Sequence, residues 1–238
     1  MKFRVSVIFL ILEFLFPYSA QGIDKRELEK FIPSNYRIVK WVEADINRDG
    51  KKDIIFGAEI KQPDYTGIKE SPPAKIIILF RKAKGLEKVW EFSKEHLYLI
   101  GLERESLEEK PLQIADINQD KIPEIIFSLG ELVGAGSGDM ETFIFIYQNG
   151  RFINLVQGNL VNLLDGGLVI RDFDKSKKGK EILVFSMIWG EDECYAGPHR
   201  YSAKFYAYSP KIHKYYCYKK VETKKKGSAG LKELGLKF

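Results

Sequence analysis

The sequence predicts an all-β protein built from about three four-stranded antiparallel units, with one short helix near the N-terminus. Three observations favour this fold class. Runs of β-branched and aromatic residues are bounded by Gly, Pro and Asn, which is typical of β-strands. An acidic segment recurs three times along the chain. Helical periodicity is scarce outside residues 24–31 and the last few residues.

The first element is a predicted secretory signal peptide at residues 1–22. A short basic start precedes a nearly unbroken apolar run, and Pro17 and small residues follow. Cleavage after Gly22 fits the small-residue rule, and cleavage after Ala20 is the alternative. An uncleaved anchor or a buried helix is the competing interpretation, since Glu13 interrupts the run. The leader predicts an exported protein, either periplasmic or secreted.

The acidic segment is an internal repeat. Its copies are EADINRDGKKDIIF at 43–56, IADINQDKIPEIIF at 114–127 and the weaker IRDFDKSKKGKEILVF at 170–185. Each copy joins two predicted strands and is followed by a longer loop, a third strand, a tight turn and a fourth strand. The Asn149-Gly150 pair is a strong signal for one such turn. Units of this size match propeller blades, and we place three of them at roughly 36–95, 96–160 and 161–220.

Loop 45–53 has the chemistry of a calcium site. Calcium takes six to eight oxygen ligands, and a short loop supplies them when side chains at alternate positions turn inward. Gly50 follows the third ligand position, where a positive φ permits a sharp turn. The predicted ligands are Asp45, Asn47, Asp49, the backbone carbonyl of Lys51, and Asp53. Such an ion neutralises clustered carboxylates, so its predicted role is structural.

The other two loops fit this pattern less well. The second loop offers Asp116, Asn118, Asp120 and Glu124 but has Lys121 where the first has Gly50. In the third loop lysines are interleaved, and the weaker candidates are Asp172, Asp174, Ser176 and Glu181, the last one residue late. The competing interpretation is that these side chains only cap turns by accepting nearby backbone N–H groups. For the third loop that interpretation is preferred.

An EF-hand requires a glutamate at position 12 and flanking helices. Position 12 is Phe56, and both flanks read as strands. The pattern D-x-[DN]-x-D-G-x-x-D before an apolar strand instead resembles the FG-GAP and VCBS repeats of integrin-type β-propellers. Phe56-Gly57-Ala58 also resembles elements of that family. The resemblance covers about 36–220. It implies a β-propeller-like array with one calcium per acidic loop, and adhesion or protein–protein contact through the blade loops.

Three blades are too few for an ordinary closed ring, which uses about four to eight. A degenerate fourth blade, an open array and a ring completed by a second chain are the alternatives. We expect a compact three-blade domain, with self-association possible because open arrays leave sheet edges to cover.

The net charge of +5 arises from the C-terminus. Residues 219–238 hold seven lysines and two glutamates, so the rest of the chain is nearly neutral. This distribution argues against a nucleic-acid partner, which requires a basic face on the fold. We expect 221–238 to be a flexible basic tail that could contact anionic surfaces.

The function predicted from these features is a non-enzymatic binding or scaffold module with a protein or glycan partner. The alternative is an enzyme acting on polysaccharide through loop carboxylates, for which Glu191, Asp192 and Glu193 are the crowded candidates. Paired catalytic acids need opposed pKa values, and the sequence shows no such pairing. Export permits a disulfide between Cys194 and Cys217, although two separate thiols are equally compatible with the sequence.

Overall fold

The computed structural model describes residues 23–61, 74–94, 112–130, 139–163, 166–190 and 197–236. The predicted signal peptide lies outside these ranges. The all-β prediction is confirmed: in the described ranges, thirteen antiparallel strands form three sheets, and the helices are short. Within the described residues, no helix has the length and apolar character needed to cross a membrane.

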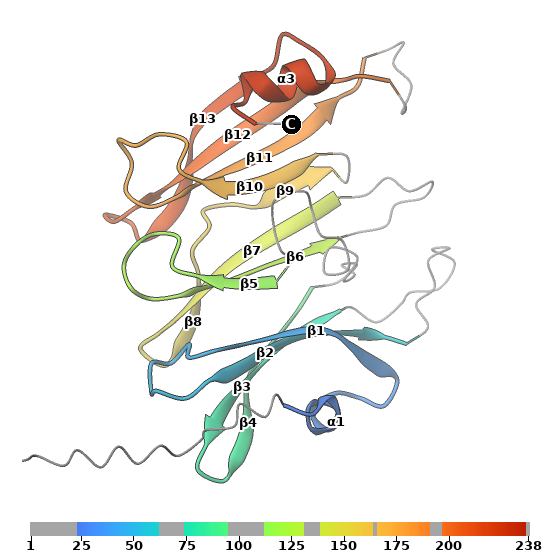
Figure 1. Ribbon diagram of the computed structural model, residues 1–238, viewed down its shortest axis with the longest axis vertical. Helices are drawn as coiled ribbons and strands as arrows, with labels where there is room; N and C mark the ends of the chain where they lie inside the picture. Colours follow the sequence, from blue (N-terminus) through green and yellow to red (C-terminus); the bar gives the residue numbers. More distant parts are fainter. Residues whose placement is uncertain are drawn as a thin grey trace, which may run out of the picture.

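The three sheets follow one another along the chain and stack from bottom to top in Figure 1. Sheet 1 has the strand order β1-β2-β3-β4, sheet 2 has β5-β6-β7-β8, and sheet 3 has β10-β11-β12-β13. Sheet 1 contains β1 (Tyr36–Ala44), β2 (Asp53–Ile60), β3 (Lys75–Lys82) and β4 (Gly85–Ser93). Sheet 2 contains β5 (Leu112–Ala115), β6 (Glu124–Gly130), β7 (Asp139–Gln148), β8 (Arg151–Asn154) and β9 (Leu160–Leu163). Sheet 3 contains β10 (Gly167–Arg171), β11 (Glu181–Ile188), β12 (Arg200–Ser209) and β13 (Lys214–Glu222).

Sheet 2 differs from the predicted four-stranded unit. Its strand β7 pairs with β8 through residues 145–148 and with β9 through residues 139–142. The outer partner of β7 is therefore split into two short strands. The connection between them carries Val156, which forms an isolated parallel bridge to Tyr215 in sheet 3. This segment therefore links the second sheet to the third.

The central strands are apolar on both faces because each sheet lies between two packed layers. In β3, Ile76 and Ile78 face sheet 2, whereas Ile77 and Leu79 face outward. The aromatic rings of Phe92, Phe127 and Phe143 fill the layer between sheets 1 and 2, with the centroids of Phe127 and Phe143 5.2 Å apart. A second layer, which includes the buried Tyr215, lies between sheets 2 and 3.

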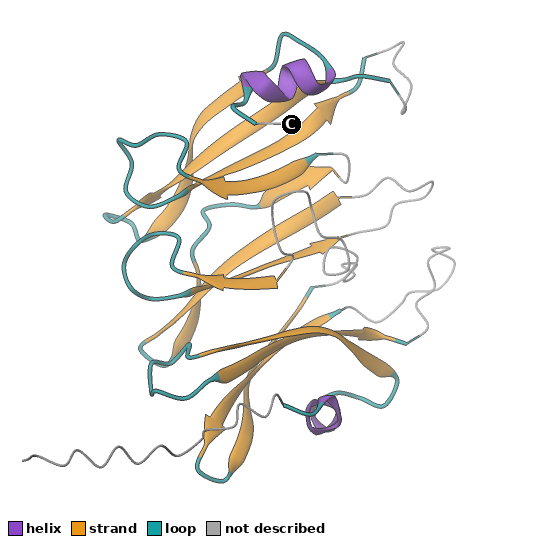
Figure 2. Ribbon diagram, in the orientation of Figure 1, coloured by secondary structure: helices purple, strands orange, loops and turns teal. Residues whose placement is uncertain are grey.

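Both outer faces of the stack are covered by the chain itself. At the N-terminus, helix α1 (Lys25–Leu28), capped by Asp24, and the 3-10 helix η1 (Glu29–Phe31) occupy the predicted helical segment. Leu28 is fully buried there against sheet 1. At the C-terminus, helix α3 (Gly227–Glu233) covers the outer face of sheet 3 (Figures 1 and 2).

The C-terminal segment is not the flexible tail predicted for 221–238. Strand β13 extends to Glu222, and the side chains of Leu234 and Leu236 are buried among Phe185, Phe205 and their neighbours. The lysines of this segment suggested solvation, but the apolar residues between them bury the outer face of sheet 3. Lys224, Lys225 and Lys226 remain exposed.

Candidate metal-binding loops

The three acidic loops lie along one edge of the stack. We call them loop 1 (residues 45–53), loop 2 (116–124) and loop 3 (172–181). Each connects the first and second strands of its sheet, and all three appear as a column on the left in Figure 2. Loops 2 and 3 are in contact, because the backbone N–H of Lys180 donates to the carbonyl of Ile117 at 2.7 Å. Gly179 makes this approach possible, since a Cβ there would lie 2.6 Å from the same carbonyl oxygen. The repeated sequence therefore occupies an equivalent position in each sheet.

Loop 1 is organised by hydrogen bonds from its backbone to its own acidic and amide side chains. The two carboxylate oxygens of Asp45 accept the N–H groups of Asp49 and Gly50, at 3.1 and 2.9 Å. The Asn47 Oδ1 also accepts from Asp49, at 2.9 Å. The carboxylate of Asp49 accepts the N–H of Lys51 at 2.9 Å. The side chains at alternate positions therefore all turn toward the inside of the loop.

Loop 2 repeats this network bond for bond. Asp116 accepts the N–H groups of Asp120 and Lys121, at 3.1 and 3.0 Å. The Asn118 Oδ1 accepts from Asp120, and Asp120 accepts from Ile122, both at 2.8 Å. The backbone agrees as well, because the fourth and sixth positions of both loops have positive φ. The similarity read from the sequence is therefore a similarity of local structure.

Each loop ends in a buried carboxylate at the start of the second strand. Asp53, Glu124 and Glu181 are all fully buried, and each pairs in register with the last residue of the preceding strand. Each accepts an N–H from the second position of its own loop: Ile46 to Asp53, Ile117 to Glu124, and Phe173 to Glu181. Glu181 therefore has the same place as the other two, and the extra residue is accommodated within loop 3.

The closing carboxylates of loops 1 and 2 differ in how completely they are satisfied. Asp53 accepts three backbone N–H groups, from Ile46, Asn47 and Arg81. Burial nevertheless raises its pKa. Burial also raises the pKa of Glu124, to about 8, and the charge of Asp120 contributes to the rise. The Glu124 Oε1 is buried without a hydrogen-bond partner in the described part of the chain.

Loop 3 lacks the shared network. The Asp174 Oδ1 accepts the N–H of Ser176 at 3.0 Å, and the Asp174 carbonyl accepts from Lys177 at 2.8 Å. Hydrogen bonds from Ser176 lower the pKa of Asp174. Asp172 is exposed. These contacts cap the turn of loop 3, and whether this loop binds calcium stays a prediction.

Loops 1 and 2 supply the chemistry that calcium requires, since their inward side chains offer only carboxylate and amide oxygens. Among the described residues, no three His, Cys, Asp or Glu side chains converge closely enough to form a ready metal cluster. The carboxylates instead accept backbone N–H groups, and each retains further lone-pair capacity. The orphaned Glu124 Oε1 is the clearest structural sign of a missing cationic or hydrogen-bonding partner.

The backbone conformation of Lys121 predicts strain in loop 2. Its φ is +71°, while Gly50 at the same position of loop 1 has φ +83°. A side chain at such φ costs about 1 kcal/mol. We therefore expect Lys121→Gly to raise the free energy of unfolding by about 1 kcal/mol and Gly50→Lys to lower it by a similar amount. A Cβ at Gly50 has no heavy atom within 4 Å, so only the backbone conformation contributes.

Urea denaturation would measure both changes. Lys51→Gly is the matched control, because Lys51 is an exposed loop lysine that is not among the residues with positive φ. It should lower stability slightly, since glycine adds freedom to the unfolded chain. Equal effects of Lys121→Gly and Lys51→Gly would show that backbone strain at Lys121 is not the cause.

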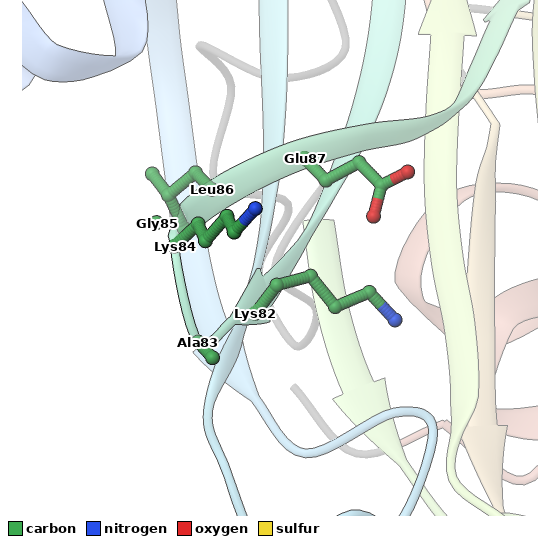
Figure 3. A pocket seen from close by; sticks show the side chains of 6 residues that line it. All are labelled: Lys82, Ala83, Lys84, Gly85, Leu86 and Glu87. Carbon is green, nitrogen blue, oxygen red and sulfur yellow. The ribbon is translucent and has the colours of Figure 1, made fainter.

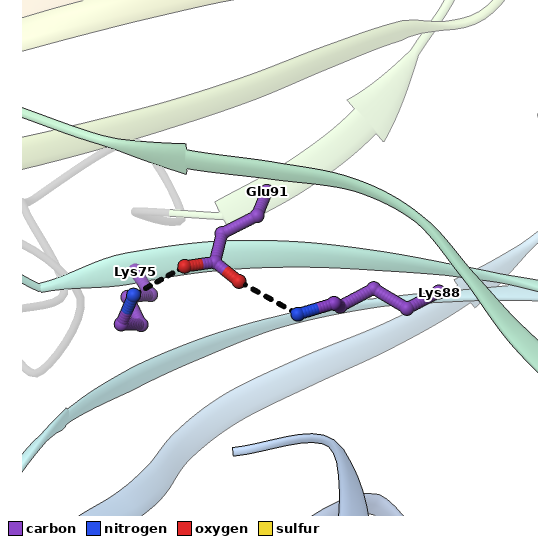
Figure 4. Close-up of polar contacts among 3 residues, drawn as sticks. All are labelled: Lys75, Lys88 and Glu91. Carbon is purple, nitrogen blue, oxygen red and sulfur yellow. Dashed lines mark hydrogen bonds and ion pairs between the residues drawn. The ribbon is translucent and has the colours of Figure 1, made fainter. Parts of the chain in front are cut away.

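Two further surface features of the described residues lie on sheet 1. Figure 3 shows a solvent-open hollow at the β3–β4 turn, lined by the six consecutive residues 82–87, among them Lys82 and Glu87. In Figure 4, Lys75 and Lys88 both donate to Glu91 on sheet 1. Partial burial acts to raise the pKa of Glu91, but these lysines outweigh it and lower the pKa. Exposed pairs of this kind add little to stability.

The residues of two sequence predictions lie outside the described ranges. The crowded acids 191–193 belong to the predicted enzyme site and Cys194 belongs to the predicted disulfide, so both stay predictions. The Cys217 thiol lies 3.6 Å from the carbonyl of Lys219. Tyr215, which is fully buried beside loop 2, was not among the site residues predicted from the sequence. Its only signal was membership of a tyrosine-rich stretch.

No protein-family model and no curated protein matches the sequence.

Proposed function

We propose that the protein is an exported, non-enzymatic binding or scaffold module in which structural calcium stabilises FG-GAP/VCBS-type blades. One observation carries the proposal: loops 1 and 2 have the same hydrogen-bond network at the same point of successive sheets. Calcium would be held by Asp45, Asn47, Asp49, the Lys51 carbonyl and Asp53 in loop 1, and by Asp116, Asn118, Asp120 and Glu124 in loop 2. The apolar leader at 1–22 supports export.

The architecture we propose is an open array of three propeller-type blades. Terminal segments that cover the end repeats are typical of linear repeat arrays, which need caps for solubility. Leu28 and Leu234, buried on the outer faces of sheets 1 and 3, support this arrangement over a ring completed by a second chain. The edges of the sheets remain as surfaces for a protein or glycan partner, or for a second copy of the chain.

A calcium-dependent thermal melt of the full chain tests the structural role of the ion. Metal that binds only the folded state stabilises it by about 2.7 kcal/mol at a hundredfold excess over Kd. We therefore expect calcium to raise Tm by several degrees relative to EDTA. Asp49→Ala and Asp120→Ala should each remove part of the rise, and the double variant should remove nearly all of it.

Glu87→Ala serves as the control, because Glu87 is an exposed acid on β4, outside the acidic loops. It should keep the full calcium response. If calcium leaves Tm unchanged in the wild-type chain, the loops are turn-forming elements and the structural-calcium proposal fails. If the double variant retains the response, calcium acts elsewhere on the molecule.

A further inference from the structure

Two buried polar atoms beside loop 2 have no hydrogen-bond partner in the described part of the chain. They are the Oε1 atom of Glu124 and the hydroxyl oxygen of Tyr215. Both side chains are 0% exposed. An unsatisfied buried polar group is costly, so each of these two atoms favours a bound partner beside loop 2.

Tyr215 reaches this place from the neighbouring sheet. It lies on β13 of sheet 3, and its ring packs in the same cluster as Ile117 and Ile122 of loop 2. Burial raises the pKa of Tyr215, and the charge of Glu124 raises it further, with smaller contributions from Tyr208, Asp120 and Asp116. The hydroxyl of Tyr215 therefore belongs to the electrostatic environment of the second loop.

The charge of loop 2 favours a cation over a water molecule as the missing species. Loop 2 carries the acidic side chains of Asp116, Asp120 and Glu124, and the amide of the fully buried Asn118 donates to Asp120 at 3.1 Å. In the described part of the chain, none of these carboxylates forms an ion pair. In loop 1, by contrast, both oxygens of Asp53 accept backbone N–H groups. Loop 2 therefore has the greater need for a cation, although its sequence fits the calcium pattern less well.

We propose that the Tyr215 hydroxyl completes the second loop's cation site from the adjacent sheet, so that one divalent ion fastens sheet 2 to sheet 3. The inference rests on the proposed calcium role of loop 2 and adds an inter-sheet ligand to it. The ligand set is made only of oxygens, which selects calcium over softer metals.

The backbone beside Tyr215 shows what this ion would stabilise. The N–H of Tyr215 donates to the carbonyl of Leu155 at 2.6 Å, and the N–H of Gln157 donates to the carbonyl of Tyr215 at 2.9 Å. Both bonds cross from the connection after β8 to the third sheet. An ion bound to Glu124 and Tyr215 would restrain the separation of the sheets at this point.

Calorimetric titration with calcium, on the full chain, tests the assignment. We expect Tyr215→Phe to lower the affinity of one site about tenfold while leaving metal-free stability unchanged or higher, because it removes an unsatisfied hydroxyl. Glu124→Gln should abolish binding at that site. Tyr216→Phe, which changes a half-buried neighbour on the same strand, is the matched control and should bind as the wild type does.

Hydrogen exchange supplies a second readout. Calcium should slow exchange of the Tyr215 and Gln157 amides in the wild type and in Tyr216→Phe, but much less in Tyr215→Phe. Asp53→Asn should weaken binding in loop 1 while this protection persists. Calcium affinity that is unchanged in Tyr215→Phe, together with lower metal-free stability, would show that Tyr215 and Glu124 bond each other and would overturn the inference. A wild-type chain that binds no calcium would instead refute the proposed function.

Discussion

Replacing Leu234 with alanine is expected to lower the free energy of unfolding by about 2–4 kcal/mol. Leu234 is 4% exposed and packs with Leu183, Phe185 and Phe205 on the outer face of sheet 3. Truncation removes buried methyl groups and leaves a cavity where the C-terminal segment covers the sheet. Urea denaturation of the full chain would measure the change, with exposed Lys232→Ala in α3 as the control.

A loss within about 0.5 kcal/mol, the range typical of surface substitutions, would contradict the capping role of the C-terminal segment.

The same observation changes how surface attachment should be tested. Deleting the last residues would remove the cap together with the charge. Replacing the exposed Lys224, Lys225 and Lys226 by glutamine keeps the cap and removes only the charges that would contact an anionic surface.

The metal-free protein is expected to lose stability as the pH rises from about 5 to 8. In the folded chain the pKa of Glu124 is about 8, against an ordinary value of 4.5. As the pH rises, Glu124 therefore loses its proton in the unfolded chain at a lower pH than in the folded chain. Between these two pKa values the folded chain must either keep the Glu124 proton or carry a buried charge. Stability from this group is complete below about pH 4.5 and falls by at most about 1.4 kcal/mol per pH unit above it. Asp53, whose pKa is also raised by burial, acts in the same direction.

Chemical denaturation in EDTA at several pH values would measure this dependence. Glu124→Gln should flatten it, because the amide has the shape of the acid but does not titrate. Asp120→Asn is the comparison: Asp120 is only partly buried, and removing its charge should weaken the pH dependence only in part, because that charge contributes to the raised pKa of Glu124. An equal slope in wild type and Glu124→Gln would assign the pH dependence to other groups. Saturating calcium should also reduce the slope, because it stabilises the ionised form.

Much of the local structure could be predicted because it depends on short-range chemistry. The Asx-type residues of loops 1 and 2 satisfy backbone groups two to five positions away, so their spacing predicts their hydrogen bonds. In loop 3 an inserted residue moves Glu181 one position away from the repeat pattern. The strand register nevertheless pairs Glu181 with the last residue of the preceding strand, as it does Asp53. A sequence pattern depends on the number of residues between two positions. Strand pairing depends on the register of the two strands, and this register can be kept when the loop between them is one residue longer.

The role of the C-terminus could not be predicted in the same way. Its lysines dominate the composition, but burial of Leu234 and Leu236 depends on the apolar outer face of sheet 3. The significance of Tyr215 likewise depends on which sheet packs beside loop 2. Neither partner is near in sequence, so no local pattern carries the information.

The sequence by itself determined the all-β class, the strand-forming repeats and the acidic loops, because each depends on residues close along the chain. Only the tertiary structure decided that the sheets stack in order with both outer faces covered. It also decided that Glu124 is left with an unpaired oxygen beside Tyr215. The physical reason is that burial and hydrogen-bond satisfaction depend on contacts between distant segments, and these exist only once the sheets have packed.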